Sequence, residues 1–224
     1  ESRPGETDME GMAAQLGAYL GFDPDGPRTI NVTVGISYIS VGKARDNLDV
    51  EIPDFDFDQV ADACCVAWKQ KLDLVEITGG TDAERRIFKT AQYHAYMMPT
   101  LFTEQGGEYI GFDGEIHEAE GFTYYSDMSL WDTFRTLHPL MTFLEPSLSR
   151  DLVVSLVTMY KQGGSLPRWP MGKGYTSCMI GTHADSVIAE AYGKGITDFD
   201  AELVYAAMVE HATGPVHNAG RDDL

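Results

Sequence analysis

The stretch 129–140 holds four side chains that could take part in chemistry, with apolar residues between them: Trp131, Asp132, Arg135 and His138. Residues three or four apart share one face of a helix, so Trp131, Arg135 and His138 are expected to line up. An indole packs against the apolar face of a sugar ring, while a carboxylate and a guanidinium exchange hydrogen bonds with hydroxyl groups. The stretch therefore suits a ligand rich in hydroxyl groups. Spacing alone favours a plainer interpretation, a partly buried Asp132–Arg135 ion pair that ties the helix to its neighbour.

The composition restricts the class of partner. The chain has 224 residues, 43% of them hydrophobic, which is enough for one large domain or parts of two. Its formal net charge of −19 repels phosphate backbones and anionic membranes, so binding to nucleic acid or to a membrane surface is disfavoured. No apolar run has the length of a membrane-spanning helix, so no membrane insertion is expected. The charge suits neutral ligands or divalent cations, and suits a solvated surface without a specific ligand equally well.

Cysteine gives no sign of a metal site or a disulfide framework. Cys64 and Cys65 are adjacent and Cys178 stands alone, without zinc-ligand spacing. No particular residues of this chain are therefore expected to bind a metal ion. Glu1 is not an initiator residue, so the natural amino terminus is expected to be missing.

The amino-terminal part predicts a β-hairpin. Apolar residues alternate over 16–22 and 30–38, and the sequence Asp23-Pro24-Asp25-Gly26 between them is typical of a turn. Two strands are not stable alone, so they are expected to complete a sheet whose other strands lie outside this chain. This indicates a fragment.

Beyond a connector over 40–55, the pattern is helical. The predicted helices open at Asp56, at the capping-box sequence Thr81 to Glu84, at Ser129, after Pro146, at Thr182 and near Asp200. Long Gly-bearing and aromatic loops over 100–128 and 166–181 separate them. We expect such loops to be functional. The arrangement indicates an α-toroid with its site at the loop end. A stacked helical repeat is the alternative, but no internal period is visible.

Several short motifs occur in order along the chain. They are Ile36 to Ser40, Ala44 to Leu48, Tyr93-His94, Tyr109 to Gly114, Tyr124-Tyr125, Ser129 to Pro139, Gly163 to Pro170, Cys178 to His183 and Lys194-Gly195. These motifs and their order resemble the calcium-dependent exo-α-mannosidases of glycoside hydrolase family 92. The resemblance runs from about Thr29 to Met208.

The resemblance implies a fold and a domain organisation. The family joins an amino-terminal β-sandwich through linking helices to an (α/α)6 barrel. The chain is therefore expected to be mainly α with a β edge: residues 1–40 as the end of the sandwich, residues 41–80 as the helical linker, and residues 81–224 as the first part of the (α/α)6 catalytic barrel.

The resemblance also implies an activity. It implies hydrolysis of terminal α-linked mannose from glycans, often α-1,2-linked, with inversion and with calcium bound to the sugar. Inversion needs an acid and a base whose carboxyl groups lie roughly 6.5–9.5 Å apart. The family carries these in motifs that do not occur here, and Arg221 to Leu224 does not reproduce the base motif. The acid, the base and most Ca²⁺ ligands are thus expected beyond Leu224, in the rest of the same polypeptide, and this fragment alone is expected to be inactive.

The resemblance assigns substrate-binding roles to five residues. Asp132 is expected to accept hydrogen bonds from mannose hydroxyl groups, and Trp131 to flank the pocket, although a core indole fits as well. Arg135 is expected to hold Asp132 in place. Trp169, on a loop between two prolines, is expected to stack on the sugar, and His183 to face the pocket or serve as a cap. His94 and His138 are expected to be core histidines.

Two other functions remain open at this point. One is a non-catalytic sugar-binding remnant that lacks the acid and the base, and the other is a different (α/α)6 glycosidase. The family usually works on glycans outside the cytoplasm, which implies a periplasmic, cell-surface or secreted protein.

Overall fold

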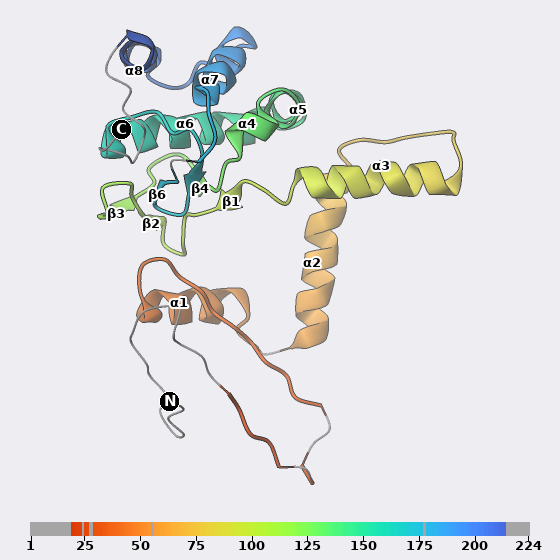
Figure 1. Ribbon diagram of the computed structural model, residues 1–224. Coiled ribbons are helices and arrows are strands. Elements are labelled where there is room, and N and C mark those ends of the chain that lie inside the picture. The colour runs from red at the N-terminus through yellow and green to blue at the C-terminus, as the bar shows by residue number, and fades with distance from the viewer. Residues whose placement is uncertain (1–18, 24, 27–28, 55, 177, 214–224) are drawn as a thin grey trace. The chain divides into compact units, whose positions relative to one another are not determined.

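The computed structural model describes residues 19–23, 25–26, 29–54, 56–176 and 178–213 (Figure 1). The chain divides into two compact units, residues 1–32 and residues 33–224. Each is described by itself below.

The first unit contains the predicted turn. Gly26 N–H donates to the Asp23 carbonyl at 3.0 Å, and Asp25 N–H donates to the Asp23 carboxylate at 2.9 Å. This confirms the turn. Residues 19–23 and 29–32 belong to no strand, and the same holds for residues 33–38 of the second unit, which end in a bend at Tyr38. A strand requires backbone hydrogen bonds to a neighbour, and the described part of the chain offers these residues none. Leu16 and Ala18, at the start of the predicted hairpin, lie outside the described residues.

The second unit begins with two predicted helices, α1 (Val41–Glu51) and α2 (Phe57–Leu72). Their first turns are capped by Ser40, whose hydroxyl accepts from Lys43 N–H, and by Asp56, whose carboxylate accepts from two backbone N–H groups. Such caps satisfy amide groups that have no partner within the helix.

Glu104 fixes the segment before α1 to a distant loop. Its carboxylate accepts from the Ser37 hydroxyl at 2.7 and 2.8 Å, from Tyr38 N–H at 2.8 Å and from the Asn47 amide at 3.2 Å. Asn47 also accepts from Gln105 N–H at 3.2 Å. The extended segment and α1 are therefore both held by the loop that follows β1.

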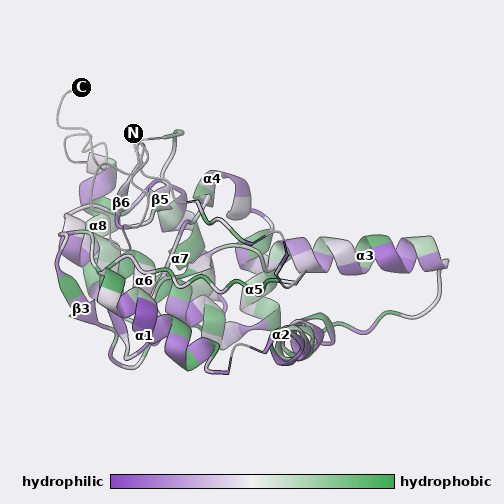
Figure 2. Ribbon diagram, turned by 90° about the horizontal axis from the view of Figure 1, so that it is seen from below, coloured by the Kyte–Doolittle hydropathy of each residue, from purple (hydrophilic) through white to green (hydrophobic). Residues whose placement is uncertain are grey.

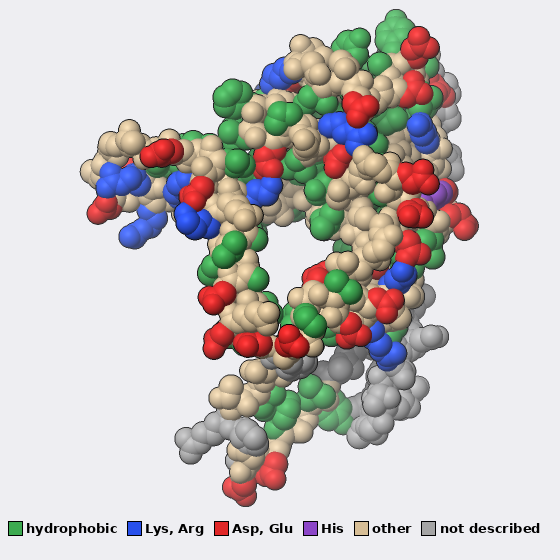
Figure 3. Space-filling view, turned by 180° about the vertical axis from the view of Figure 1, so that it is seen from behind, with side chains coloured by type: hydrophobic (Ala, Val, Ile, Leu, Met, Phe, Trp, Pro, Cys, Tyr) green, Lys and Arg blue, Asp and Glu red, His purple; other side chains and the backbone are tan. Residues whose placement is uncertain are grey.

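Helix α3 (Asp82–Ala95) starts at the predicted capping box, in which Thr81 and Glu84 exchange hydrogen bonds. It packs on α2 through Trp68 and Tyr93, whose ring centroids are 4.3 Å apart. Hydrophilic and hydrophobic residues alternate along α3 (Figure 2). The space-filling view shows Lys and Arg gathered on this helix and carboxylates spread over the remaining visible face (Figure 3).

The predicted loop 100–128 contains four short strands. They are β1 (Thr100–Leu101), β2 (Glu108–Ile110), β3 (Ile116–Glu118) and β4 (Tyr125–Ser126). β1 pairs with β4 and β2 pairs with β3, both antiparallel. Tyr109 stacks on the fully buried Tyr124 at 4.0 Å, so the aromatic residues of this segment form part of the core.

The helix predicted from Ser129 is broken into α4 (Leu130–Thr133) and α5 (Leu137–Leu144). Pro139 explains the break, because its ring would clash with the carbonyl of Arg135 in a continuous helix and it has no N–H to donate there. The helix starts again at Leu137, with Pro139 in the first turn of α5. The expectation that Trp131, Arg135 and His138 share one helix face is wrong.

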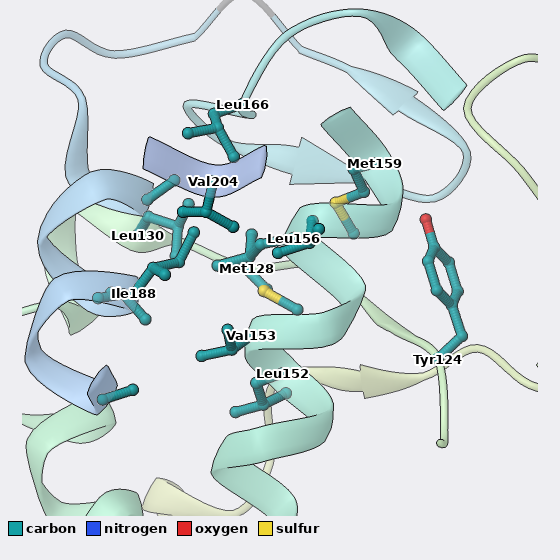
Figure 4. Close-up of a cluster of buried hydrophobic side chains, with 14 of the residues drawn as sticks. Tyr124, Met128, Leu130, Leu152, Val153, Leu156, Met159, Leu166, Ile188 and Val204 are labelled. Atoms are coloured by element: carbon teal, nitrogen blue, oxygen red, sulfur yellow. The ribbon is translucent and has the colours of Figure 1, made fainter. Parts of the chain in front are cut away.

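The core is built on α6 (Pro146–Gly163). Pro146 occupies its first turn, and Gly164, at φ 80°, ends it in the left-handed conformation that glycine adopts without strain. Along α6, Leu152, Val153, Leu156 and Met159 are buried (Figure 4). Their neighbours include Ile188 of α7 (His183–Gly193) and Val204 of α8 (Ala201–Thr213). Between α6 and α7 lies a small hairpin, β5 (Pro170–Met171) with β6 (Gly174–Tyr175).

Candidate functional site

Asp132 is presented to solvent by a short, well-anchored helical turn. Leu130 is fully buried, whereas Trp131 and Asp132 of the same turn are exposed. The Ser129 hydroxyl donates to Asp132 Oδ2, and the Ser129 carbonyl accepts from Asp132 N–H at 3.0 Å. These contacts fix the carboxylate, and within the described residues its Oδ1 has no donor. The carboxylate therefore has a fixed orientation, and one of its oxygens can accept a further hydrogen bond.

Arg135 does not hold Asp132, which corrects the prediction. The ion pair of Asp132 and Arg135 is absent from the described part of the chain. The Arg135 guanidinium lies instead over the Phe134 ring, with Cζ 4.9 Å from the centroid. Helix α4 ends at Thr133, so Arg135 lies outside the helix that carries Asp132.

His183 reaches the same region from the first position of α7. Its imidazole meets the Phe134 ring at 4.2 Å between centroids. Burial lowers the pKa of His183, the Arg135 charge lowers it further, and Asp185 opposes both effects. A neutral imidazole can donate one hydrogen bond and accept one, which suits contact with a sugar.

Gly181 makes the position of His183 possible. It has φ 86°, and a Cβ atom there would lie 2.3 Å from His183 Cε1. Only glycine leaves that space free.

Trp169 precedes a hairpin that is bound to the segment before α4. Met128 N–H donates to the Pro170 carbonyl at 3.2 Å, the Ser126 hydroxyl donates to the Gly172 carbonyl at 2.6 Å, and Gly172 N–H donates to the Asp127 carboxylate at 2.8 Å. The Trp169 carbonyl itself accepts from the Thr176 hydroxyl at 2.8 Å. Trp169 is half-buried and rigidly connected.

The fold thus brings together residues predicted from distant motifs. Contacts between α4 and α7 bring the helix that carries Asp132 close to the helix that begins with His183. The charge of Arg135 acts on the pKa of His183, and the hairpin that follows Trp169 is bonded to the segment that leads into α4. The roles of Phe134 and Gly181 in positioning His183 were not predicted. In the sequence, Gly181 is marked only by standing two residues before a histidine. Of the two predicted core histidines, His138 is buried and His94 is exposed, so the prediction for His94 is wrong.

The described residues include no cluster of carboxylate, imidazole and thiol groups of the kind that holds a metal ion. Among them, no group of three or more His, Cys, Asp or Glu side chains is placed to hold a metal ion.

Residues 43–224 match the glycosyl hydrolase family 92 catalytic domain. The chain belongs to glycosyl hydrolase family 92. This family 92 chain is 32% identical over 207 residues to an uncharacterized secreted glycosidase of Arthroderma benhamiae, and the match covers 88% of this chain and 22% of that protein.

Solved family 92 structures are similar in fold as well as in sequence. One is an alpha-mannosidase from Bacteroides thetaiotaomicron, with 33% identity and a TM-score of 0.76 over 81% of this chain and 24% of that chain. Its complex with mannoimidazole gives the same values. Another is an inverting mannosidase from Bacteroides thetaiotaomicron VPI-5482, with 32% identity and a TM-score of 0.75 over 82% of this chain and 25% of that one.

This family 92 chain spans about a quarter of the length of these solved relatives. Their similarity confirms the predicted fold class, a mainly α chain corresponding to part of an (α/α)6 toroid. The division into a linker over 41–80 and a barrel from 81 remains a prediction. In the part of the chain that the structure describes, none of the helices has both the length and the apolar character needed to cross a membrane.

Proposed function

We propose that this protein is an inverting exo-α-mannosidase that releases terminal mannose from glycans, and that this chain supplies part of the mannose site. The observation that carries the proposal is the Asp132 carboxylate. It is exposed, is oriented by Ser129, and lies in a chain of a family whose solved relatives include alpha-mannosidases. A carboxylate accepts hydrogen bonds from two neighbouring hydroxyl groups of a sugar without needing a charge on the ligand.

The other residues of this region have supporting roles in the proposal. Trp131 is exposed and flanks the sugar, and the indole of Trp169 stacks on it. His183 exchanges a hydrogen bond with a hydroxyl group, and Arg135 acts through Phe134 and His183 rather than through Asp132. The acid and the base are not assigned to residues of this chain.

The proposed substrate, metal and location come from the resemblance to the family 92 mannosidases. We propose α-1,2-linked mannose at the end of a glycan, Ca²⁺ bound by ligands mostly outside this chain, and a periplasmic, cell-surface or secreted protein. The secreted relative supports a location outside the cytoplasm.

The test is sugar release by the full-length protein. We expect it to hydrolyse an aryl α-mannoside and not the matching α-glucoside, and we expect NMR to detect β-mannose as the first product, as inversion requires. Release of glucose instead would favour a different glycosidase on the same fold. Mannose binding by calorimetry without any hydrolysis would favour the sugar-binding remnant.

Calcium is tested in the same assay. We expect EDTA to abolish mannose release and added Ca²⁺ to restore it, whereas Mg²⁺ at the same concentration should not. Full activity in EDTA would contradict calcium dependence and leave the mannosidase proposal intact.

A further inference from the structure

Two residues with a left-handed backbone conformation precede the helices of the candidate site. They are Asp127, at φ 58° before α4, and Met179, at φ 62° before α7. In the part of the chain that the structure describes, every other residue with a positive φ is a glycine. Side chains disfavour this conformation, so a residue keeps it where neighbouring contacts hold it, and such positions are concentrated at functional sites.

Gly172 of the turn between β5 and β6 holds Asp127. Its N–H donates to the Asp127 carboxylate at 2.8 Å, and its carbonyl accepts from the Ser126 hydroxyl at 2.6 Å. Both backbone polar groups of this glycine are therefore bound by side chains that lie directly before the turn carrying Asp132.

Arg168 holds Met179 in a similar way. Its guanidinium donates to the Met179 carbonyl at 2.8 Å. The Thr176 hydroxyl donates to the Trp169 carbonyl at 2.8 Å and accepts from Cys178 N–H at 3.2 Å. The loop that leads into α7 is therefore bound to the backbone of Trp169 and to the side chain of the residue before it.

The segment 166–170 that carries Trp169 is itself fixed in the core. Leu166, Pro167 and Pro170 are buried, and Leu166 belongs to the central hydrophobic cluster (Figure 4). A proline fixes its own φ and restricts the residue before it to extended conformations, so the backbone of Trp169 has little freedom. This segment is a rigid support to which the loops before α4 and α7 are both attached.

We propose that Asp127 and Arg168 are positioning residues of the sugar site, which act through Trp169. Asp127 fixes Trp169 relative to the turn that carries Asp132. Arg168 fixes it relative to the helix that begins with His183. A sugar ring is rigid, so its stacking wall and its hydrogen-bonding partners must stand at set separations. The inference rests on the proposed function and extends it to two residues that need not touch the sugar.

The test compares variants of the full-length protein by kcat and KM for an aryl α-mannoside and by the Kd of mannoimidazole. Asp127→Gly removes the acceptor and adopts the left-handed conformation without strain. We expect it to lower kcat/KM and to raise Kd, each roughly tenfold. Asp127→Asn keeps an acceptor oxygen and tolerates this conformation, so it should recover most of the loss.

Asp200→Gly is the matched control. The Asp200 carboxylate also accepts from a backbone N–H, that of Leu203 at 3.0 Å, but at the start of α8, which carries none of these residues. The variant should lose some stability in thermal unfolding and keep the wild-type kcat/KM.

Arg168 provides an independent variant in case Asp127→Gly does not fold. Arg168→Met removes the donor to Met179 and keeps a long side chain, and we expect kcat/KM to fall threefold to tenfold. Arg168→Lys retains a donor and should lose less.

A double variant separates positioning from a purely structural role. When Asp127→Gly is added to Trp169→Ala, neither kcat/KM nor Kd should change further, because the indole that Asp127 positions is absent. Poor folding would instead reduce activity equally in both backgrounds.

The inference is overturned by wild-type kcat/KM and Kd in both Asp127→Gly and Arg168→Met, or by equal losses from Asp127→Gly with and without Trp169. Failure of the proposed function is a different result, a wild-type protein that binds mannoimidazole and releases no mannose. The Kd values of the variants then decide the inference alone. Absence of mannoimidazole binding by the wild type would overturn both.

Discussion

The Phe134 ring meets the His183 imidazole edge-on, with centroids 4.2 Å apart and ring planes inclined by 65°. Phe134 is the residue that follows α4, and His183 is the residue that begins α7. The contact therefore connects the turn that presents Asp132 with the helix that presents His183. The Arg135 guanidinium also lies on the Phe134 ring, with its Cζ atom 4.9 Å from the ring centre.

Replacing this ring should impair catalysis through the position of His183. We expect Phe134→Leu to lower kcat/KM for an aryl α-mannoside roughly tenfold, because small displacements of binding groups cost about that much or more. The control is Phe143→Leu, a change of the same kind at a ring that is 81% exposed. Equal kcat/KM in Phe134→Leu and wild type would show that the ring contact does not position the site.

Asp132→Ala should have a larger effect. It removes the carboxylate proposed to accept from the sugar and leaves the hydroxyl groups of the bound sugar unpaired, so kcat/KM should fall by roughly a hundredfold or more. Asp49→Ala is the matched control, since Asp49 is an exposed carboxylate of α1. Wild-type kinetics in Asp132→Ala would remove Asp132 from the mannose site.

Ser129→Ala tests whether the orientation of the Asp132 carboxylate matters, because it leaves the carboxylate itself in place. The Ser129 hydroxyl donates to Asp132 Oδ2, so its loss should free the carboxylate to rotate. We expect kcat/KM to fall about threefold to tenfold, less than in Asp132→Ala, because one hydrogen bond is lost and the acceptor remains. When Ser129→Ala is added to Asp132→Ala, kcat/KM should not fall further. Additive losses would mean that Ser129 acts elsewhere.

Gly181→Ala should displace His183. The added Cβ would lie 2.3 Å from Cε1 and 2.7 Å from Nδ1 of the ring, so the imidazole must move. Gly195→Ala is a close control, because Gly195 has φ 89°, similar to the 86° of Gly181, but no atom lies within 4 Å of its added Cβ. Both variants strain the backbone, and we expect only Gly181→Ala to reduce kcat/KM. A similar loss in both would point to backbone strain alone.

His138 should make stability depend on pH. Its pKa is about 4 in the folded chain, below the usual 6.5, chiefly because burial disfavours the charged form, with Glu190 opposing. Between these two values the unfolded chain binds more protons, so the contribution is complete above about pH 6.5 and is lost as pH falls toward 4. The shift corresponds to roughly 3 kcal/mol of unfolding free energy.

Denaturant unfolding at pH 7.5 and pH 5 measures this dependence. We expect His138→Gln to lose less stability than wild type over this interval, because glutamine does not titrate. His94→Gln is the control, since His94 is exposed, and it should retain the wild-type dependence. An unchanged dependence in His138→Gln would mean that other groups cause it.

Local signals in the sequence were sufficient for most helix boundaries. Asp56, the Thr81–Glu84 capping box and Gly164 act on backbone groups within a few residues, so their effect can be read without knowing the fold. Ordered motifs were likewise sufficient to place the chain in glycosyl hydrolase family 92. Asp132 and Trp131 were found in this way, since the motif that carries them is contiguous.

Tertiary structure decided what lies beside these residues. Helical spacing predicted Arg135 next to Asp132, but the chain breaks before Pro139 and Arg135 packs on Phe134. The pairing of Phe134 with His183 and the union of residues 126–128 with the hairpin 170–175 join segments more than forty residues apart. Residues 29–38 lack a partner strand within the described chain, so alternation alone did not make them strands. Sequence fixes interactions over a few residues, whereas contacts between distant segments depend on how whole elements pack, which no local pattern encodes.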